Sequence, residues 1–147
     1  MNTFEKMLFL KSAPIFKYVK DDALIGVASI LEKQLVQPGE LIIPKGDLGV
    51  IMYMIVTGKV KIHDEDLIFK ELGDHEIFGE LSALSPAKRT ASVTAVEETI
   101  LLKISNTAIY DLMEIQPGLA KGIIHFLCQR IRSSQKDITS SIILNRA

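Results

Sequence analysis

The sequence predicts a mainly β domain with flanking helices at both ends. Within residues 35–104, short runs of β-branched and aliphatic residues alternate with turn signals such as Pro38-Gly39 and Gly58-Lys59. Many short strands at such spacing are typical of a sandwich or a barrel. Before and after this region, apolar residues recur at helical spacing. The predicted order is therefore helices, a β core and helices.

Two short helices are predicted within residues 1–34. The first stops near Lys11, where a Ser-Ala-Pro sequence interrupts the apolar pattern. The second begins at Asp21 or Asp22, either of which can cap the apolar segment that follows.

Two further helices are predicted within residues 105–140. Ser105 is placed to cap the first helix, and Pro117 suits the first turn of the second, longer one. Since the two helices meet between Ile115 and Leu119, a hinge is expected there.

Length and composition indicate one soluble domain, spanning residues 1–147. A chain of 147 residues with 48% hydrophobic content can bury one core. The formal net charge of −1 predicts no direct nucleic-acid binding, and no apolar run is long enough for membrane insertion. The only cysteine, Cys128, cannot form an internal disulfide and is expected to be a small buried side chain. These features favour a cytoplasmic location.

The segment of residues 77–95 carries the strongest chemical pattern. Gly79 lets the backbone approach a ligand closely, and the apolar residues after Glu80 can form a helical turn whose amides point at an anion. Arg89 supplies a planar, permanently charged fork that suits phosphate oxygens, and Glu80 supplies acceptors that suit a ribose hydroxyl. Thr90 adds a hydroxyl beside the arginine. Together these residues predict a phosphate cradle.

The motif FGEL, a short helix and loop, and then RTASVTA resemble the phosphate-binding cassette of cyclic-nucleotide-binding domains. The resemblance implies that Glu80 binds the ribose 2′-hydroxyl and that Arg89 binds the cyclic phosphate. It also implies contacts from the residues around them, namely Gly79, the amides of Leu81 and Ser82, and Thr90 and Ala91.

The resemblance extends over nearly the whole chain. Residues 38–49 resemble the glycine-bearing hairpin of the family, and residues 53–62 resemble its Y-x-I-x-x-G-x-V strand pair. It implies an eight-stranded antiparallel jelly-roll-like β roll over residues 35–104, with the cassette at residues 78–92. The implied ligand is cAMP or cGMP, with no metal or other cofactor.

Some positions depart from the family or are given a structural role. His75 stands where the family often has glycine and Val50 where it often has a polar residue, so the loops there are expected to be built differently. Gly46, Gly49 and Gly58 are predicted to be turn residues rather than ligand contacts.

No catalytic or metal-binding pattern is visible. His63, His75 and His125 fall on three different predicted elements, without the spacing of a metal site. Ser82, Ser85 and Ser92 lack a nucleophile elbow. The chain is therefore predicted not to be an enzyme. Three alternatives stay open: a transcription regulator of the catabolite-activator type without its DNA-binding domain, a metal-dependent jelly-roll enzyme, and a degenerate domain that binds no nucleotide.

The last predicted helix carries a stripe of Ile124, Leu127 and Ile131, with Ile138 farther along. This stripe is interpreted as a seam facing the core or a second copy in a homodimer, or as a lid over the bound base. Movement of the C-terminal helices is expected to carry the signal to an effector domain or partner protein outside this chain.

Overall fold

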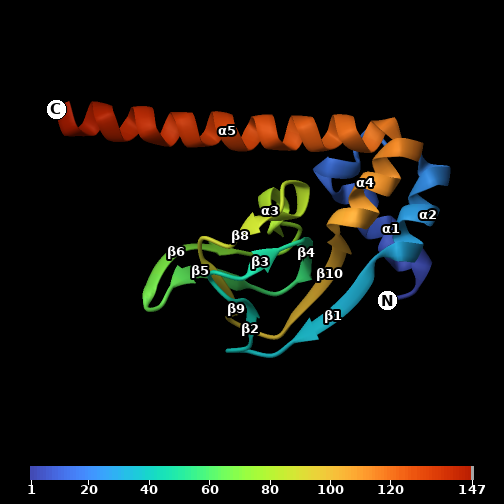
Figure 1. Ribbon diagram of the computed structural model, residues 1–147, viewed down its shortest axis with the longest axis horizontal. Helices are drawn as coiled ribbons and strands as arrows, with labels where there is room; N and C mark the ends of the chain where they lie inside the picture. The colour runs from blue at the N-terminus through green and yellow to red at the C-terminus, as the bar shows by residue number, and fades with distance from the viewer. Residues whose placement is uncertain (147) are drawn as a thin grey trace.

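The protein is built around two four-stranded antiparallel sheets, with helices gathered at one end of the roll (Figure 1). The computed structural model describes residues 1–146, with side chains described through residue 139. The helix α5 (Pro117–Arg146) leaves this end and extends along one side of the roll.

The strand order follows from the pairing of distant segments. The first sheet has the order β1 (Glu32–Val36), β10 (Thr99–Ser105), β4 (Ile51–Thr57) and β7 (Ile77–Phe78). The second has the order β2 (Leu41–Ile43), β9 (Ser92–Ala95), β5 (Val60–Asp64) and β6 (Leu67–Leu72). A separate pair joins β3 (Leu48–Gly49) to β8 (Ala87–Lys88).

This architecture confirms the predicted mainly β class with flanking helices. The described residues contain ten strands rather than eight. The eight strands of the two sheets match the expected number, and the difference is the short pair of β3 and β8 outside them.

The remaining helices begin and end close to the predicted positions, except for a short 3₁₀ helix that was not predicted. They are α1 (Thr3–Ser12), the short 3₁₀ helix η1 (Pro14–Phe16), α2 (Asp21–Ile30), α3 (Glu80–Leu84) and α4 (Asn106–Ile115).

The helix caps were predicted in part. Ser105 caps α4, since its side chain accepts a hydrogen bond from the Ala108 amide at 3.2 Å, and Pro117 is the first residue of α5. The prediction for α2 was wrong by one position: Lys20 is the N-cap, and Asp21 is the first helical residue. A carboxylate in the first turn still favours the helix through the macrodipole.

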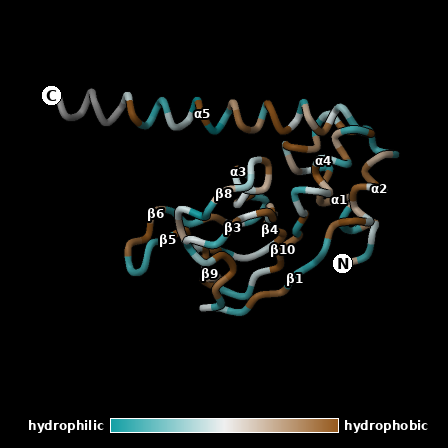
Figure 2. The backbone as a smooth tube through the Cα atoms, viewed as in Figure 1, coloured by the Kyte–Doolittle hydropathy of each residue, from teal (hydrophilic) through white to brown (hydrophobic). Residues whose placement is uncertain are grey.

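Alternation along the central strands builds two cores. On β4, Met52 and Met54 face the helices, whereas Tyr53 and Ile55 face the second sheet. The same side-chain period of two places a helix-facing core on one side of the first sheet and an inter-sheet core on the other. Figure 2 shows hydrophobic segments along β4 and β10, where both cores meet.

The start of α5 is pressed against the backbone between α1 and α2. A Cβ atom on Gly118 would lie 2.0 Å from the Tyr18 carbonyl oxygen, and one on Gly122 would lie 2.0 Å from that of Ile15. Both distances are far below van der Waals contact. Two helices meet where the hinge was expected, because α4 ends at Ile115 and α5 begins at Pro117. The glycine contacts pack the start of α5 on the η1 segment and the residues that follow it.

We expect Gly118→Ala and Gly122→Ala to destabilise the protein, each by about 1–3 kcal/mol through overpacking. In an open helical site the same change stabilises by about 0.5–1 kcal/mol. Gly26 of α2 offers the control, because nothing lies within 4 Å of its added Cβ. Urea denaturation of the three variants measures the difference. A gain in stability for all three would contradict this close backbone contact.

Candidate functional site

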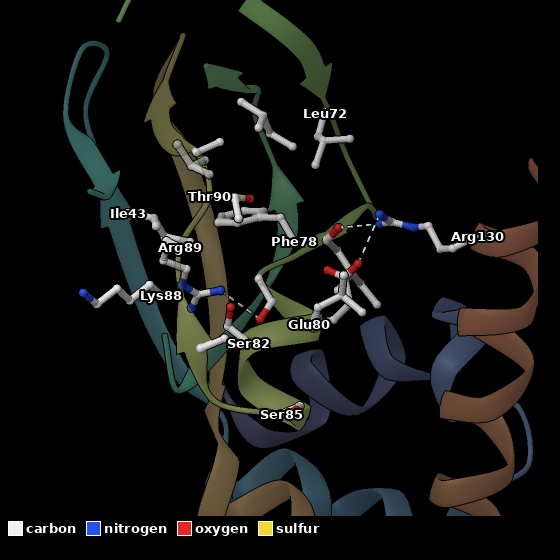
Figure 3. Close-up of a pocket in the computed structure, with 17 residues that line it drawn as sticks. Ile43, Leu72, Phe78, Glu80, Ser82, Ser85, Lys88, Arg89, Thr90 and Arg130 are labelled. Atoms are coloured by element: carbon white, nitrogen blue, oxygen red, sulfur yellow. Dashed lines mark hydrogen bonds and ion pairs between the residues drawn. The ribbon is translucent and has the colours of Figure 1, made fainter. Parts of the chain in front are cut away.

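A cleft of about 510 Å³ opens on the roll between the cassette and α5. Pockets of roughly 300–1,000 Å³ hold small ligands. Apolar side chains from both sheets form much of its wall, including Ile43, Ile62, Leu72, Phe78 and Val93. Figure 3 shows the polar groups of the cassette and Arg130 of α5 around this wall. The cleft therefore combines an apolar surface with a charged rim.

All seven residues predicted for the site line this cleft. They are Gly79, Glu80, Leu81, Ser82, Arg89, Thr90 and Ala91. The Leu81 side chain is exposed, which is consistent with a contribution from its amide rather than its side chain. Thr90 is exposed, whereas Ser82 and Ala91 are half-buried.

Gly79 connects β7 to α3 in a conformation that favours glycine. Its φ is 78°, in the left-handed region, and an added Cβ would lie 2.9 Å from the Ile51 carbonyl oxygen. The same Cβ would lie 3.0 Å from Nη1 of Arg89. The backbone at Gly79 is thus packed between a strand and the arginine of the site.

Arg89 is held by backbone groups on two sides. Its Nη2 donates to the Ile51 carbonyl at 2.7 Å, and its Nη1 donates to the Gly79 carbonyl at 3.1 Å. Burial lowers the pKa of Arg89, while Tyr53 and Glu80 act in the opposite direction. Because its hydrogen-bond acceptors are neutral carbonyls, its positive charge has little compensation in this position.

Gly49 makes room for this arginine. A Cβ on Gly49 would lie 2.1 Å from Nε of Arg89 and 2.6 Å from Cβ of Ser82. The prediction that Gly49 is a turn residue was therefore wrong. Gly49 lies in β3, and the absence of a side chain there lets Arg89 and Ser82 pack against the strand. Gly46 and Gly58 have φ values of 93° and 117°, which confirms their turn role.

Glu80 begins α3 and is buried, with 6% of its surface exposed. Its Oε1 lies 3.1 Å from Nη1 of Arg130, and Nη2 of Arg130 also donates to the Ile77 carbonyl at 2.8 Å (Figure 3). A buried carboxylate requires such a partner, because desolvation without one is costly. The last helix thus reaches the cleft through a guanidinium group.

Sequence reasoning did not identify Arg130. The signal available was a cation on the face of the last helix that also carries Leu119 and Ile123, both of which are buried. The predicted stripe on this helix is divided: Leu127 packs against the core, whereas Ile124, Ile131 and Ile138 are exposed. None of these four residues lines the cleft.

Two hydrogen bonds from α4 hold the C-terminal end of α3, the helix of the cassette. The Asn106 amide donates to the Ala83 carbonyl, and the Tyr110 hydroxyl donates to the Leu84 carbonyl at 2.5 Å. These bonds satisfy carbonyl groups at the C-terminal end of α3, and such carbonyls have no partners within the helix. The position of α3 therefore depends on α4.

His75 lies in the turn between β6 and β7, where the loop was expected to be built differently from the family. Its φ of 68° lies in the left-handed region, so a histidine adopts the backbone conformation that glycine favours. Its ring stacks on Phe9 with centroids 5.2 Å apart. This contact ties the turn to α1.

The described part of the chain shows no cluster of three or more His, Cys, Asp or Glu side chains placed to hold a metal ion. Within that same part, no helix has both the length and the apolarity needed to cross a membrane.

Cys128 is half-buried on α5, rather than fully buried as predicted.

A family model described as the cyclic nucleotide-binding domain matches residues 33–116. The chain belongs to this family. The matched range runs from β1 through the cassette to the end of α4, so it includes the residues predicted for the site. This cyclic nucleotide-binding domain is similar to both regulators and channels.

Over 134 residues, the domain is 30% identical to the cyclic AMP receptor protein of Thermus thermophilus, covering 88% of this chain and 62% of that protein. It is 32% identical over 123 residues to a cyclic nucleotide-gated channel of Caenorhabditis elegans, covering 78% and 17% of the two chains. The crystal structure of the Thermus thermophilus catabolite activator protein matches with a TM-score of 0.77 and 28% identity, covering 86% and 62%. The chain thus spans less than two thirds of each of these relatives.

Proposed function

We propose that this regulatory domain is a cAMP or cGMP sensor that binds the nucleotide in the cleft and transmits occupancy through α5. The main support is the convergence of Arg89 and buried Glu80 on one cleft of ligand size. The family match makes a cyclic nucleotide the chemically appropriate occupant.

Arg89 is proposed to bind the cyclic phosphate. A guanidinium group has five N–H donors, and Arg89 uses two of its nitrogens on the Ile51 and Gly79 carbonyls. Its remaining donors are available to an anion. An anion would also compensate the charge that burial disfavours.

Glu80 is proposed to accept a hydrogen bond from the ribose 2′-hydroxyl. Arg130 lies against Oε1, and an ionised carboxylate accepts several bonds, so Glu80 can serve both groups. The amides of Leu81 and Ser82 fall in the first turn of α3, where helical amides have no intrahelical acceptor. Thr90 and Ala91 are proposed to contact the ligand on the opposite side.

The apolar wall suits a purine, and we propose cAMP as the first ligand to test. The named relative in Thermus thermophilus is a cyclic AMP receptor protein. Thr90 also suits cGMP, since its hydroxyl can bond a base edge. Calorimetric titration with both nucleotides distinguishes the two ligands.

α5 is proposed to carry the signal, with Arg130 as its contact to the cleft rather than an aliphatic lid. Ligand shifts an equilibrium only through its differential affinity for two states. Glu80 belongs to both the proposed ribose contact and the ion pair with Arg130, so binding changes the environment of that pair.

The proposal also includes a non-enzymatic role, a cytoplasmic location and an effector outside residues 1–147. Residues 1–147 would act as one unit, because the helix-facing core joins α1, α2, α4 and α5 to the first sheet. A transcription regulator of the catabolite-activator type is the second candidate, favoured by the Thermus thermophilus relative.

We expect Arg89→Leu to weaken cyclic nucleotide binding by about 2–5 kcal/mol, as for loss of one partner in a desolvated charge pair. This corresponds to roughly 30-fold to several thousand-fold in Kd. Arg132→Leu is the matched control, since Arg132 is exposed and lies outside the cleft. Titration calorimetry measures both variants. Unchanged affinity in a folded Arg89→Leu protein would exclude Arg89 from phosphate binding.

We expect Glu80→Ala to weaken binding by about 1.5–3 kcal/mol, the range for a hydrogen bond to a charged group. A 2′-deoxy nucleotide should lose affinity for the native protein but lose little more for Glu80→Ala, because both changes remove the same bond. Glu98→Ala, at an exposed site, serves as control. Additive losses would show that Glu80 does not contact the ribose.

We expect bound nucleotide to slow amide hydrogen exchange in residues 79–92 and also in residues 120–131 of α5. The second effect arises because Arg130 joins α5 to Glu80 and Ile77. In Arg130→Met, the first segment should still become protected, while the second should respond less. Identical exchange of residues 120–131 with and without nucleotide in the native protein would contradict coupling through α5.

A further inference from the structure

Basic side chains follow one line along the helix α5. They are Lys121, His125, Arg132 and Lys136, and all four are exposed. At about 100° per residue, they lie within about 60° of one another, and they span about 22 Å at the usual rise of a helix. Asp137 is the only acidic residue of α5, and it lies at least about 100° from the nearest of them. This side of the helix therefore carries a single sign of charge.

The segment that follows η1 adds a further cation at the start of this line. Nζ of Lys17 lies 5.7 Å from the centroid of the Tyr18 ring, and Nζ of Lys121 lies 4.5 Å from the same centroid. The His125 ring also packs on Tyr18, with centroids 5.2 Å apart. Tyr18 therefore gathers basic side chains from two segments that are distant in the sequence. We call Lys17 and the four helical residues the basic ridge.

The charges of the basic ridge repel one another. The ammonium groups of Lys17 and Lys121 are at most about 10 Å apart, which is a Debye length at 0.1 M salt. Arg132 and Lys136 are four residues apart on one helix, where like charges are unfavourable. Among residues 1–139, no carboxylate forms an ion pair with any of these cations. An anionic partner would relieve this repulsion.

The basic ridge is accessible while α5 stays packed on the roll. Leu119 and Ile123 are buried on nearly the opposite side of the helix, where Arg130 also contacts Glu80. None of the residues of the ridge lines the cleft. A partner can therefore bind the ridge without entering the nucleotide cleft.

The shape of the basic ridge suits a peptide segment. It is straight and about one side chain wide, and the residues that share its arc on the distal helix, Gln129 and Thr139, are polar. At its outer end, Arg132 and Lys136 line a shallow hollow with Gln135 and Thr139. One acidic helix or extended strand can follow such a line and place successive carboxylates against it.

A lipid surface or a nucleic acid fits the basic ridge less well. Stable binding of a helix to a membrane requires insertion of an apolar face. The exposed isoleucines of α5, such as Ile131, point about a third of a turn away from the ridge, so a flat surface cannot meet both. A nucleic acid is bound through many phosphate contacts, and the formal net charge of −1 opposes the approach of so strong a polyanion.

From these observations we propose that the basic ridge is a docking surface for an acidic peptide segment of a partner protein. The carboxylates of that segment accept hydrogen bonds from the permanent cations of the ridge, which are Lys17, Lys121, Arg132 and Lys136. Docking does not require an occupied cleft. Its test is therefore made without nucleotide, and its failure would leave the proposed nucleotide site untouched.

Fluorescence anisotropy with a labelled oligoglutamate, long enough to span the basic ridge, tests the docking. The native chain should bind it, and added salt should weaken binding. The double variant Lys121→Glu with Lys136→Glu should raise Kd about tenfold, because each reversal removes an attraction and adds a repulsion. Lys33→Glu with Lys70→Glu is the control, since it changes the net charge equally at exposed sites of β1 and β6. Urea denaturation verifies that both variants fold.

No binding by the native chain, or equal weakening in the two double variants, would overturn the proposal. Vesicles that contain phosphatidylserine and a DNA duplex of random sequence are titrated in parallel. Tighter binding of either one than of the oligoglutamate would exclude an acidic peptide as the preferred partner.

Lysine acetylation locates the contact on the native chain. With oligoglutamate bound, acetic anhydride should modify Lys17, Lys121 and Lys136 more slowly, as measured by mass spectrometry of tryptic peptides. Lys33 and Lys70 should react at the same rate with and without the peptide, because they lie off the basic ridge. Equal protection of all five lysines would show that the oligoglutamate binds without preference for this surface.

Discussion

The placement of Arg89 is the constraint on which the rest of the site depends. Its amide donates to the Asp47 carbonyl at 2.8 Å, and its carbonyl accepts from the Gly46 amide at 2.9 Å. Its side chain bonds the carbonyls of Ile51 and Gly79. One residue therefore joins the turn before β3, the start of β4 and the start of α3. Because these bonds are made within the protein, the guanidinium is already oriented, which would lower the cost of the proposed phosphate contact.

This arrangement is possible only because two glycines leave space around the arginine. Side chains at Gly49 and Gly79 would overlap Arg89 or press closely on it and on the neighbouring backbone. The same principle acts at the other end of the molecule, where Gly118 and Gly122 bring α5 against carbonyl groups. Both contacts are between segments far apart in the sequence, and in both the absence of a side chain determines how closely they approach.

Helix α5 joins two separate contacts on one helix. Its first turns are anchored by glycines, its middle reaches the cleft through Arg130, and Ile124, Ile131 and Ile138 are exposed on another face. A helical repeat of 3.6 residues separates these faces while keeping them mechanically connected. Occupancy of the cleft would consequently act on this helix through the pair of Arg130 and Glu80, which joins α5 to the cassette.

The amino-acid sequence by itself determined the fold class, the position of the cassette in the chain and many of the helix boundaries, because these follow from local signals. Ser105 and Pro117 mark helix starts through their own hydrogen-bonding and ring geometry. Glu80 and Arg89 were predicted as site residues from one short segment that resembles the cassette of the family, and both line the same cleft. Only the tertiary structure decided the role of Gly49, the close backbone contacts of Gly118 and Gly122, and the pairing of Arg130 with Glu80. Each of these depends on how closely two distant parts of the backbone approach, and local spacing along a chain carries no measure of that distance.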